Sequence, residues 1–250
     1  MPSLRISRRA ADRLRAGHLW VYRSDLEVSV AGAPGEAETE LAAGALVTVA
    51  DGRGAPLGTG LYSTSSQIAA RLVARTPELS RAEYLAQLRV RMDGALALRR
   101  ELAPFSAETT AHRLIFSEAD GLPGIIADRY NDLVILQLLH QGTAQDDVRR
   151  VLVEGFRAAL APGDEPLTIW ERPDPRIREL EQLPAPAPGA LFTTVAEDAA
   201  PATTTFALNG LRFGYDAAAG QKTGAFLDQR LNYAAAAQWV RQSGRSGRAL

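Results

Sequence analysis

Three strand-like segments follow one another closely between residues 46 and 74, with turns but no helix between them. The segments are 46–50, 57–62 and 68–74. Asp51-Gly52-Arg53-Gly54 has the composition of a hairpin turn between the first two. Short strands at this spacing predict a small barrel. A short helix over 8–16 precedes them, because Ser7 can cap its start and Gly17 can end it.

The second block alternates helices with strands. Ser80 and Glu83 form a capping box, which marks the start of a helix. The apolar residues of that helix recur along one stripe: Tyr84, Leu88, Met92, Ala95 and Leu96. A second amphipathic helix is predicted over 146–160, and strands are predicted over 113–116, 125–128, 133–139 and 167–171. These elements indicate a small α+β domain, followed by a Pro-rich loop over 183–189.

The last block begins with a predicted hairpin, 204–208 and 211–215, turned at Asn209-Gly210. A Gly-Gln-Lys-Thr-Gly loop and a helix that begins near Leu227 follow. The final residues after this helix do not resemble a domain end, so we expect a sequence cut short. The expected division is 1–74, 75–200 and 201–250: an α+β chain followed by the start of an α/β domain.

Composition excludes several classes of site. There is no cysteine, so these residues contain no disulfide, no cysteine nucleophile and no Cys-x-x-Cys zinc ribbon. His18, His112 and His140 are far apart in sequence and lack metal-ligand spacing, so no metal site is expected. No apolar run approaches the roughly 18 residues of a membrane helix, and residues 1–25 lack the apolar core of a signal peptide. We therefore expect a soluble cytoplasmic protein.

Charge gives two candidate surfaces. The net charge is −1, so no overall field attracts nucleic acid, but the first 25 residues hold six arginines. Arg8, Arg9, Arg13 and Arg15 lie on the exposed sides of the first predicted helix. The single lysine, Lys222, lies in the Gly-rich loop, where backbone amides and a helix start can receive an anion. An ordinary turn with a capped helix explains the same loop.

Four segments, in order, resemble the bacterial 23S rRNA (cytosine-5-)-methyltransferases that carry an N-terminal PUA domain. The segments are 15–22 (Arg-Ala-Gly-His-Leu-Trp-Val-Tyr), 60–68 (Gly-Leu-Tyr-Ser-Thr-Ser-Ser-Gln-Ile), 118–130 (containing Glu-Ala-Asp-Gly-Leu-Pro-Gly-Ile and Asp-Arg-Tyr) and 222–230 (Lys-Thr-Gly-Ala-Phe-Leu-Asp-Gln-Arg). The resemblance covers essentially the whole chain. Leu19 replaces the usual proline, and Ala225 replaces an aromatic residue.

The resemblance implies a PUA barrel, a middle domain and the truncated entry to a doubly wound methyltransferase domain. It implies methyl transfer from S-adenosylmethionine to carbon 5 of a cytosine in 23S rRNA, after a cysteine thiolate has added to carbon 6. That cysteine is absent here, so the chain alone is expected to be inactive and to lack measurable cofactor binding. No membrane or metal is implied, and a homodimer is left open.

Site residues carried over from the resemblance form two groups. Five would contact RNA: Arg8, Arg9, Arg13, Arg15 and His18. Five would lie at the cofactor in the intact enzyme: Lys222, Thr223, Asp228, Gln229 and Arg230. Lys222 or Arg230 would receive the cofactor carboxylate, and Asp228 would hold Arg230 in place.

Structural roles compete with these assignments. Trp20 and Tyr22 are predicted to lie in the barrel core, although they could also stack on RNA. The stretch 120–124 is predicted to be a tight structural turn. Two other functions stay open: a stand-alone RNA-binding protein or degenerate enzyme, and an interaction protein unrelated to RNA.

Overall fold

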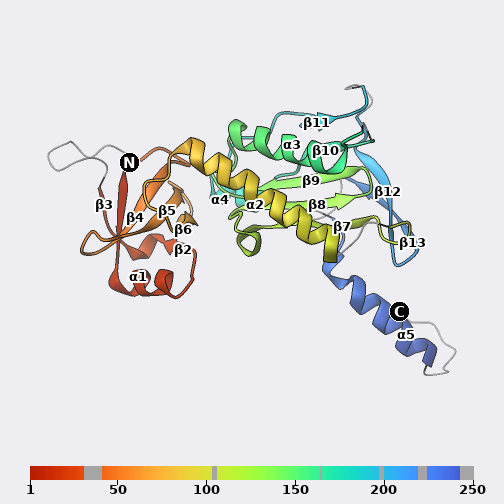
Figure 1. Cartoon of the computed structure of the whole chain (residues 1–250), viewed down its shortest axis with the longest axis horizontal. Helices are drawn as coiled ribbons and strands as arrows, with labels where there is room; N and C mark the ends of the chain where they lie inside the picture. Colours follow the sequence, from red (N-terminus) through yellow and green to blue (C-terminus); the bar gives the residue numbers. More distant parts are fainter. Residues whose placement is uncertain (31–40, 103–105, 164, 197–199, 219–223, 243–250) are drawn as a thin grey trace.

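The computed structural model describes residues 1–30, 41–102, 106–163, 165–196, 200–218 and 224–242. In chain order the elements are β1 (Ser3–Ile6), α1 (Arg8–Arg15), β2 (Trp20–Tyr22), η1 (Arg23–Asp25), β3 (Leu26–Val30), β4 (Leu46–Asp51), β5 (Pro56–Tyr62), β6 (Ile68–Ala74), α2 (Arg81–Leu102), β7 (Ala111–Phe116), η2 (Ser117–Asp120), β8 (Ile125–Tyr130), β9 (Leu133–Leu138), α3 (Asp146–Leu160), β10 (Thr168–Glu171), α4 (Pro175–Leu180), β11 (Phe192–Thr193), β12 (Thr203–Leu208), β13 (Leu211–Asp216), η4 (Leu227–Gln229) and α5 (Arg230–Gln242). A barrel-like part, a middle sheet and α5 follow one another along the long axis (Figure 1).

The N-terminal part is a six-stranded sheet in the order β2-β6-β5-β4-β1-β3. β1 lies between β3, to which it is antiparallel, and β4, to which it is parallel. α1 packs Ala10, Ala11 and Leu14 against this sheet, and Ser7 caps the helix by accepting the amide hydrogen of Ala10. The apolar stripe of α1 therefore closes the barrel core and leaves its arginines outside.

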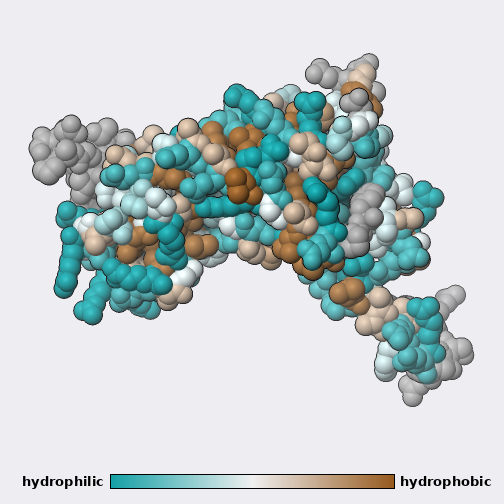
Figure 2. All heavy atoms as spheres, in the orientation of Figure 1, coloured by the Kyte–Doolittle hydropathy of each residue, from teal (hydrophilic) through white to brown (hydrophobic). Residues whose placement is uncertain are grey.

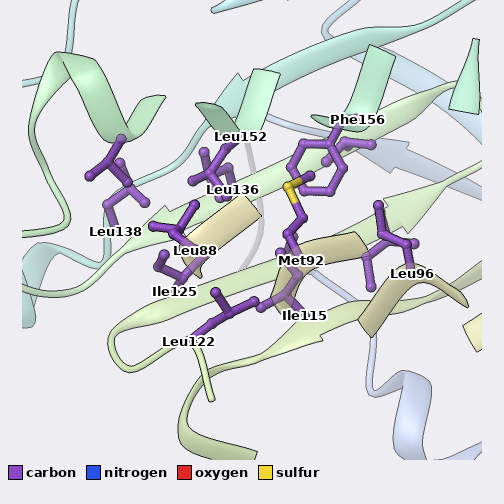
Figure 3. Packing of buried hydrophobic residues seen from close by; sticks show 14 of the residues in the cluster. Leu88, Met92, Leu96, Ile115, Leu122, Ile125, Leu136, Leu138, Leu152 and Phe156 are labelled. Atoms are coloured by element: carbon purple, nitrogen blue, oxygen red, sulfur yellow. The ribbon is translucent and has the colours of Figure 1, made fainter. Parts of the chain in front are cut away.

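The middle part is a five-stranded sheet in the order β11-β10-β9-β8-β7. Helices α2 and α3 cover one face of this sheet, and Figure 3 shows Met92 of α2 reaching toward Phe156 of α3. Helix α3 can pack closely on α2 because Gly155 has no side chain: a Cβ there would lie 2.5 Å from the Met92 sulfur. β9 is buried on both faces, and its Val134 and Leu136 belong to the same buried hydrophobic cluster as Met92 and Phe156.

The hairpin β12–β13 covers part of the opposite face. Its Phe206, Leu208 and Tyr215 pack against Tyr130 and Ile135 of the middle sheet. The hairpin turns at Asn209-Gly210, and both residues have positive φ angles (52° and 78°), as a tight two-residue connection requires. The hairpin thereby joins the middle sheet to the segment that enters α5.

The barrel-like part has its own core and also contributes side chains to the core of the middle part. Leu61 of β5 and Val73 of β6 belong to the same buried cluster as Leu88, Met92 and Phe156 of the middle part. Gly142 allows a close approach here, because a Cβ at this position would lie 2.6 Å from Leu61 Cδ2. The barrel-like part is thus fixed on the middle part by packing as well as by sequence.

Most predicted elements are confirmed within two or three residues. The capping box of Ser80 and Glu83 and the helix over 146–160 are present, and all five stripe residues of α2 are buried. The 120–124 turn is structural, with positive φ at Gly121 and Gly124. Trp20 and Tyr22 are half-buried rather than core residues, so that prediction was wrong.

Candidate functional site

The segment after the hairpin is anchored on two stacked tyrosines. The rings of Tyr130 and Tyr215 lie 4.0 Å apart, nearly parallel, and the backbone amide of Ala225 donates to the Tyr130 hydroxyl at 3.0 Å. Gly224 has φ +126°, and a Cβ on it would lie 2.3 Å from Tyr215 Cε2. Only glycine allows the chain to pass this close to the rings. Lys222 and Thr223 lie outside the described residues.

The remaining candidate cofactor residues hold the start of α5 in place. Arg230 donates through Nη1 to Thr109 Oγ1 at 3.4 Å, and its carbonyl accepts a hydrogen bond from Asn209. The amide oxygen of Gln229 accepts from Asn232 at 2.7 Å. The structure shows Arg230 in contact with Thr109, and the expectation that Asp228 holds Arg230 in the intact enzyme stays a prediction.

These residues do not by themselves enclose a cofactor. Asp228 is exposed, whereas Gln229 and Arg230 are half-buried and already bonded to this chain. The segment therefore offers polar groups along an open surface. A site that encloses S-adenosylmethionine would need other residues in addition to 224–230.

His112 lies in β7, the edge strand of the middle sheet, near several guanidinium groups. Burial is the main cause that lowers the pKa of His112 to about 4, and the nearby guanidinium of Arg129 lowers it further. Arg99 and Arg230 add smaller effects in the same direction. His112 is therefore neutral at pH 7, and no metal role follows: the described residues contain no group of three His, Cys, Asp or Glu side chains able to hold a metal ion.

The arginines of α1 divide into two kinds. Arg13 forms an ion pair with Asp25, and Arg15 pairs with Asp12 and Asp51. Arg8 and Arg9 are exposed and take part in no ion pair among the described residues. Two of the four predicted RNA-binding arginines thus have acidic partners in the fold, and two keep their charge for an outside ligand.

Three rings cluster at strand β2, beside Arg13. The His18 ring, just before the strand, has its centroid 5.9 Å from that of Trp20 and 6.0 Å from that of Tyr22, and the last two lie 6.4 Å apart. We name these three residues the ring cluster. The guanidinium of Arg71 lies 5.2 Å from the Trp20 ring centroid, and that of Arg13 lies 5.6 Å from the Tyr22 ring. Aromatic rings close to guanidinium groups are typical of surfaces that bind single-stranded nucleic acid.

Glu118 links this ring cluster to the middle part. Its Oε1 accepts hydrogen bonds from Trp20 Nε1 at 2.7 Å and from Arg71 Nη1 at 2.6 Å. Burial tends to raise the pKa of Glu118, but hydrogen bonds from Ser117 and Trp20 and the charge of Arg71 lower it overall. The carboxylate therefore stays ionised, and we name Trp20, Arg71 and Glu118 the junction cluster. In the sequence Glu118 stands out only as part of a motif, and its contacts with Trp20 and Arg71 could not be predicted from it.

A second polar contact lies on the same boundary. The side chain of Gln141 accepts the backbone amide of Thr64 at 2.9 Å and donates to Thr64 Oγ1 and Ser65 Oγ. It also donates to the carbonyl of Glu181 at 2.8 Å. One buried amide thus connects the barrel-like part, β9 and the segment after α4.

Large apolar side chains remain uncovered at the C-terminal end. α5 has no buried residue, and it projects away from the rest of the molecule (Figure 1). Figure 2 shows apolar residues at the surface where this helix begins. The most exposed members are Phe226, Leu231, Tyr233 and Trp239, each at least half exposed. No helix in the described part of the chain is long and apolar enough to cross a membrane.

Comparison with known proteins gives two results. Residues 4–75 match the family model of a PUA-like domain. The chain is 32% identical over 228 residues to the Ribosomal RNA large subunit methyltransferase I of Photobacterium profundum, and 36% identical over 230 residues to that of Shewanella denitrificans. Each match covers 91% of this chain and 52% of the relative. The chain therefore spans about half the length of the curated relatives it matches.

Solved structures agree with this at the level of the fold. A structure described as a SAM-dependent methyltransferase from Streptococcus mutans matches with a TM-score of 0.68 and 20% identity, over 93% of this chain and 53% of that one. A methyltransferase in complex with SAH matches with a TM-score of 0.65, also at 20% identity. Residues 4–75 thus resemble a PUA-like domain, within a chain that is similar over nine-tenths of its length to the proteins named Ribosomal RNA large subunit methyltransferase I.

Proposed function

We propose that these 250 residues are the RNA-binding front part of an rRNA methyltransferase. The parent enzyme would transfer a methyl group from S-adenosylmethionine to carbon 5 of a cytosine in 23S rRNA, in the cytoplasm. The observation that carries the proposal is similarity over nine-tenths of the chain to relatives named for large-subunit rRNA methylation. The PUA-like match at residues 4–75 supports RNA as the ligand of the barrel-like part.

Two surfaces of the barrel-like part suit RNA. Arg8 and Arg9 offer unpaired positive charge for phosphates, which makes binding depend on salt. The ring cluster of His18, Trp20 and Tyr22 offers rings for bases or riboses. Arg13 and Arg15 support this surface through their ion pairs, and we assign them a structural role rather than direct phosphate contact.

The exposed apolar residues of helix α5 support the proposal that the parent enzyme has a further domain, which covers this helix. An isolated helix of 13 residues is marginal in water, and this one exposes Leu231, Tyr233 and Trp239. We propose that its apolar residues pack against a methyltransferase domain of the parent enzyme. Residues 201–250 would then be the entry to that domain, and residues 75–200 the middle domain.

The same reasoning assigns no catalysis to these residues alone. Methylation of cytosine carbon 5 needs a thiolate that adds to carbon 6, and this sequence contains no cysteine. Asp228, Gln229 and Arg230 would line one side of the cofactor site once other walls are present, together with Lys222 and Thr223. We expect no binding of S-adenosylmethionine to the 250 residues.

The test separates RNA binding from methyl transfer. Anisotropy of a labelled 23S rRNA fragment measures binding, and replacing Arg8 and Arg9 together by alanine should weaken it and reduce the salt slope by about 1–2. A matched control replaces Arg100 and Arg176, two exposed arginines outside the barrel, by alanine. Tritiated methyl transfer to unmodified rRNA should stay at background. Equal binding by both double variants, or methyl transfer above background, would contradict the proposal.

A second candidate is a stand-alone RNA-binding protein or degenerate enzyme. The absence of cysteine favours it, because binding through the barrel needs no nucleophile. The DNA that follows the codon for Leu250 distinguishes the two. An open frame that encodes a Gly-rich loop, Asp-Pro-Pro and a cysteine supports the parent enzyme, and a stop codon supports the binding protein.

A further inference from the structure

An exposed aromatic ring stands on a hydrogen-bonded backbone two residues before Glu118 of the junction cluster. Phe116, at the end of β7, is 51% exposed. Its backbone amide donates to Asp120 Oδ2 at 2.6 Å, and Asp120 is held in turn by two hydrogen bonds from Arg99, at 2.6 and 2.8 Å. Asp120 is itself almost fully buried. The ring is therefore presented to solvent from a backbone that has little freedom to move.

A guanidinium group lies against the same ring. Arg113 Cζ is 5.1 Å from the ring centroid of Phe116. Arg113 donates Nε and Nη2 to the two oxygens of the buried Asp128, at 2.9 and 3.0 Å, and its side chain is 37% exposed. The third nitrogen, Nη1, takes no part in this paired contact. Ion pairing therefore orients Arg113 and still leaves N–H groups for a second anion.

The position of this pair is fixed relative to the barrel. Glu118 follows Phe116 by two residues, and its carboxylate holds Trp20 and Arg71 of the junction cluster. Since Leu61 and Val73 also share the core of the middle part, the ring cluster and the Phe116 ring keep one mutual arrangement. A ligand that spans both meets a preorganised surface, which lowers the entropic cost of binding.

A single exposed phenylalanine is common and needs no explanation by itself. The exposed rings of Phe226 and Trp239 are a different case, because they lie at or in helix α5, which we propose packs against a further domain. Phe116 combines three features: a backbone held by Asp120, a guanidinium against its ring and a carboxylate contact to the barrel two residues away. A base can stack on an aromatic ring while a neighbouring guanidinium binds phosphate.

We propose that Phe116 and Arg113 form a nucleotide subsite for single-stranded RNA, which extends the RNA surface from the barrel onto the middle sheet. Phe116 stacks on one base, and Arg113 Nη1 donates to the adjoining phosphate. The proposal rests on the proposed function, because it names a second contact for the same RNA.

The experiment uses the full chain and a single-stranded 23S rRNA fragment that carries 2-aminopurine, whose fluorescence falls when it stacks. Phe116→Ala should weaken binding about 5- to 100-fold, leave the salt slope unchanged and abolish the fall in fluorescence. Phe116→Trp should keep both the affinity and the fall in fluorescence. Arg113→Lys keeps a cation for Asp128 but loses the guanidinium fork, so it should weaken binding and reduce the salt slope by about 1. Leu98→Ala, at another exposed apolar position, should change nothing.

The outcomes separate this inference from the proposed function. If Phe116→Ala binds within twofold of the parent chain while the Arg8 and Arg9 variant still weakens binding, the subsite is wrong and the RNA function stands. If the parent chain does not bind RNA at all, both fail. If Phe116→Ala lowers the melting temperature and weakens duplex and single-stranded RNA equally, the ring is structural and the inference is overturned.

Discussion

Replacing Glu118 by alanine should destabilise the chain more than removal of any surface carboxylate. The change removes the acceptor of Trp20 Nε1 and of Arg71 Nη1 together. Hydrogen bonds to a charged group contribute about 1.5–3 kcal/mol each, and removal of one partner of a buried pair costs about 3–5 kcal/mol. The Glu118 side chain is 24% exposed and that of Arg71 is 12% exposed, so water compensates part of the loss. We expect a decrease of about 2–4 kcal/mol in the free energy of unfolding.

The assay is urea unfolding followed by circular dichroism, because Trp20 fluorescence would respond to the substitution itself. Asp93→Ala is the matched control: Asp93 pairs with Arg89 one helical turn away, and both side chains are more than a third exposed. That pair should contribute about 0.3–0.5 kcal/mol. Glu118→Gln should fall between the two, since the amide oxygen can still accept from Trp20 but lacks the charge that Arg71 requires.

A Glu118→Ala variant as stable as Asp93→Ala would refute this reasoning. It would mean that packing of Leu61 and Val73 alone holds the barrel on the middle part. A large loss in Glu118→Gln, equal to that in Glu118→Ala, would instead assign the whole effect to the ion pair with Arg71.

Three other changes test other parts of the structure. Gly224→Ala should cost about 1–3 kcal/mol in urea unfolding, because φ is +126° and a Cβ would lie 2.3 Å from the Tyr215 ring. Met92→Ala should cost about 2–5 kcal/mol by the same assay, since it opens a cavity in the largest core. Burial lowers the pKa of His112 to about 4 and that of His140 to about 3. The unfolded chain therefore binds more protons, stability should fall as pH drops from about 6.5 toward these values, and NMR titration should find both rings neutral at pH 5.5.

Local patterns predicted the elements whose signals lie within a few residues. The stripe of α2 and its capping box depend only on neighbours three or four positions apart, and both are present. The Asn209-Gly210 hairpin follows from two residues that tolerate positive φ. The strands β1 and β3 were missed, because β1 has only four residues and its parallel pairing with β4 joins segments more than 40 residues apart.

The functional contacts depend on longer separations still. Trp20 and Glu118 are 98 residues apart, and nothing in either segment indicates the other. The partners of Arg13 and Arg15 lie closer in sequence, 12 residues away at Asp25 and 36 residues away at Asp51, and were missed because they belong to other elements of the barrel. Tyr130 belonged to a quoted motif, but its role as the acceptor of the Ala225 amide needed the fold.

The shared placement of Leu61 and Val73 in the middle core bears on how this domain behaves as an evolutionary unit. A module that is exchanged between proteins normally closes its own core and meets its neighbours through a separable surface. Here Leu61 and Val73 of the barrel pack in the core of the middle part. Separating the two parts after β6 would therefore expose apolar side chains on both. We therefore expect the barrel to fold stably only together with the sheet beside it. Grafting it alone onto another enzyme should yield a protein that aggregates, whereas grafting both parts should preserve a single cooperative unfolding transition.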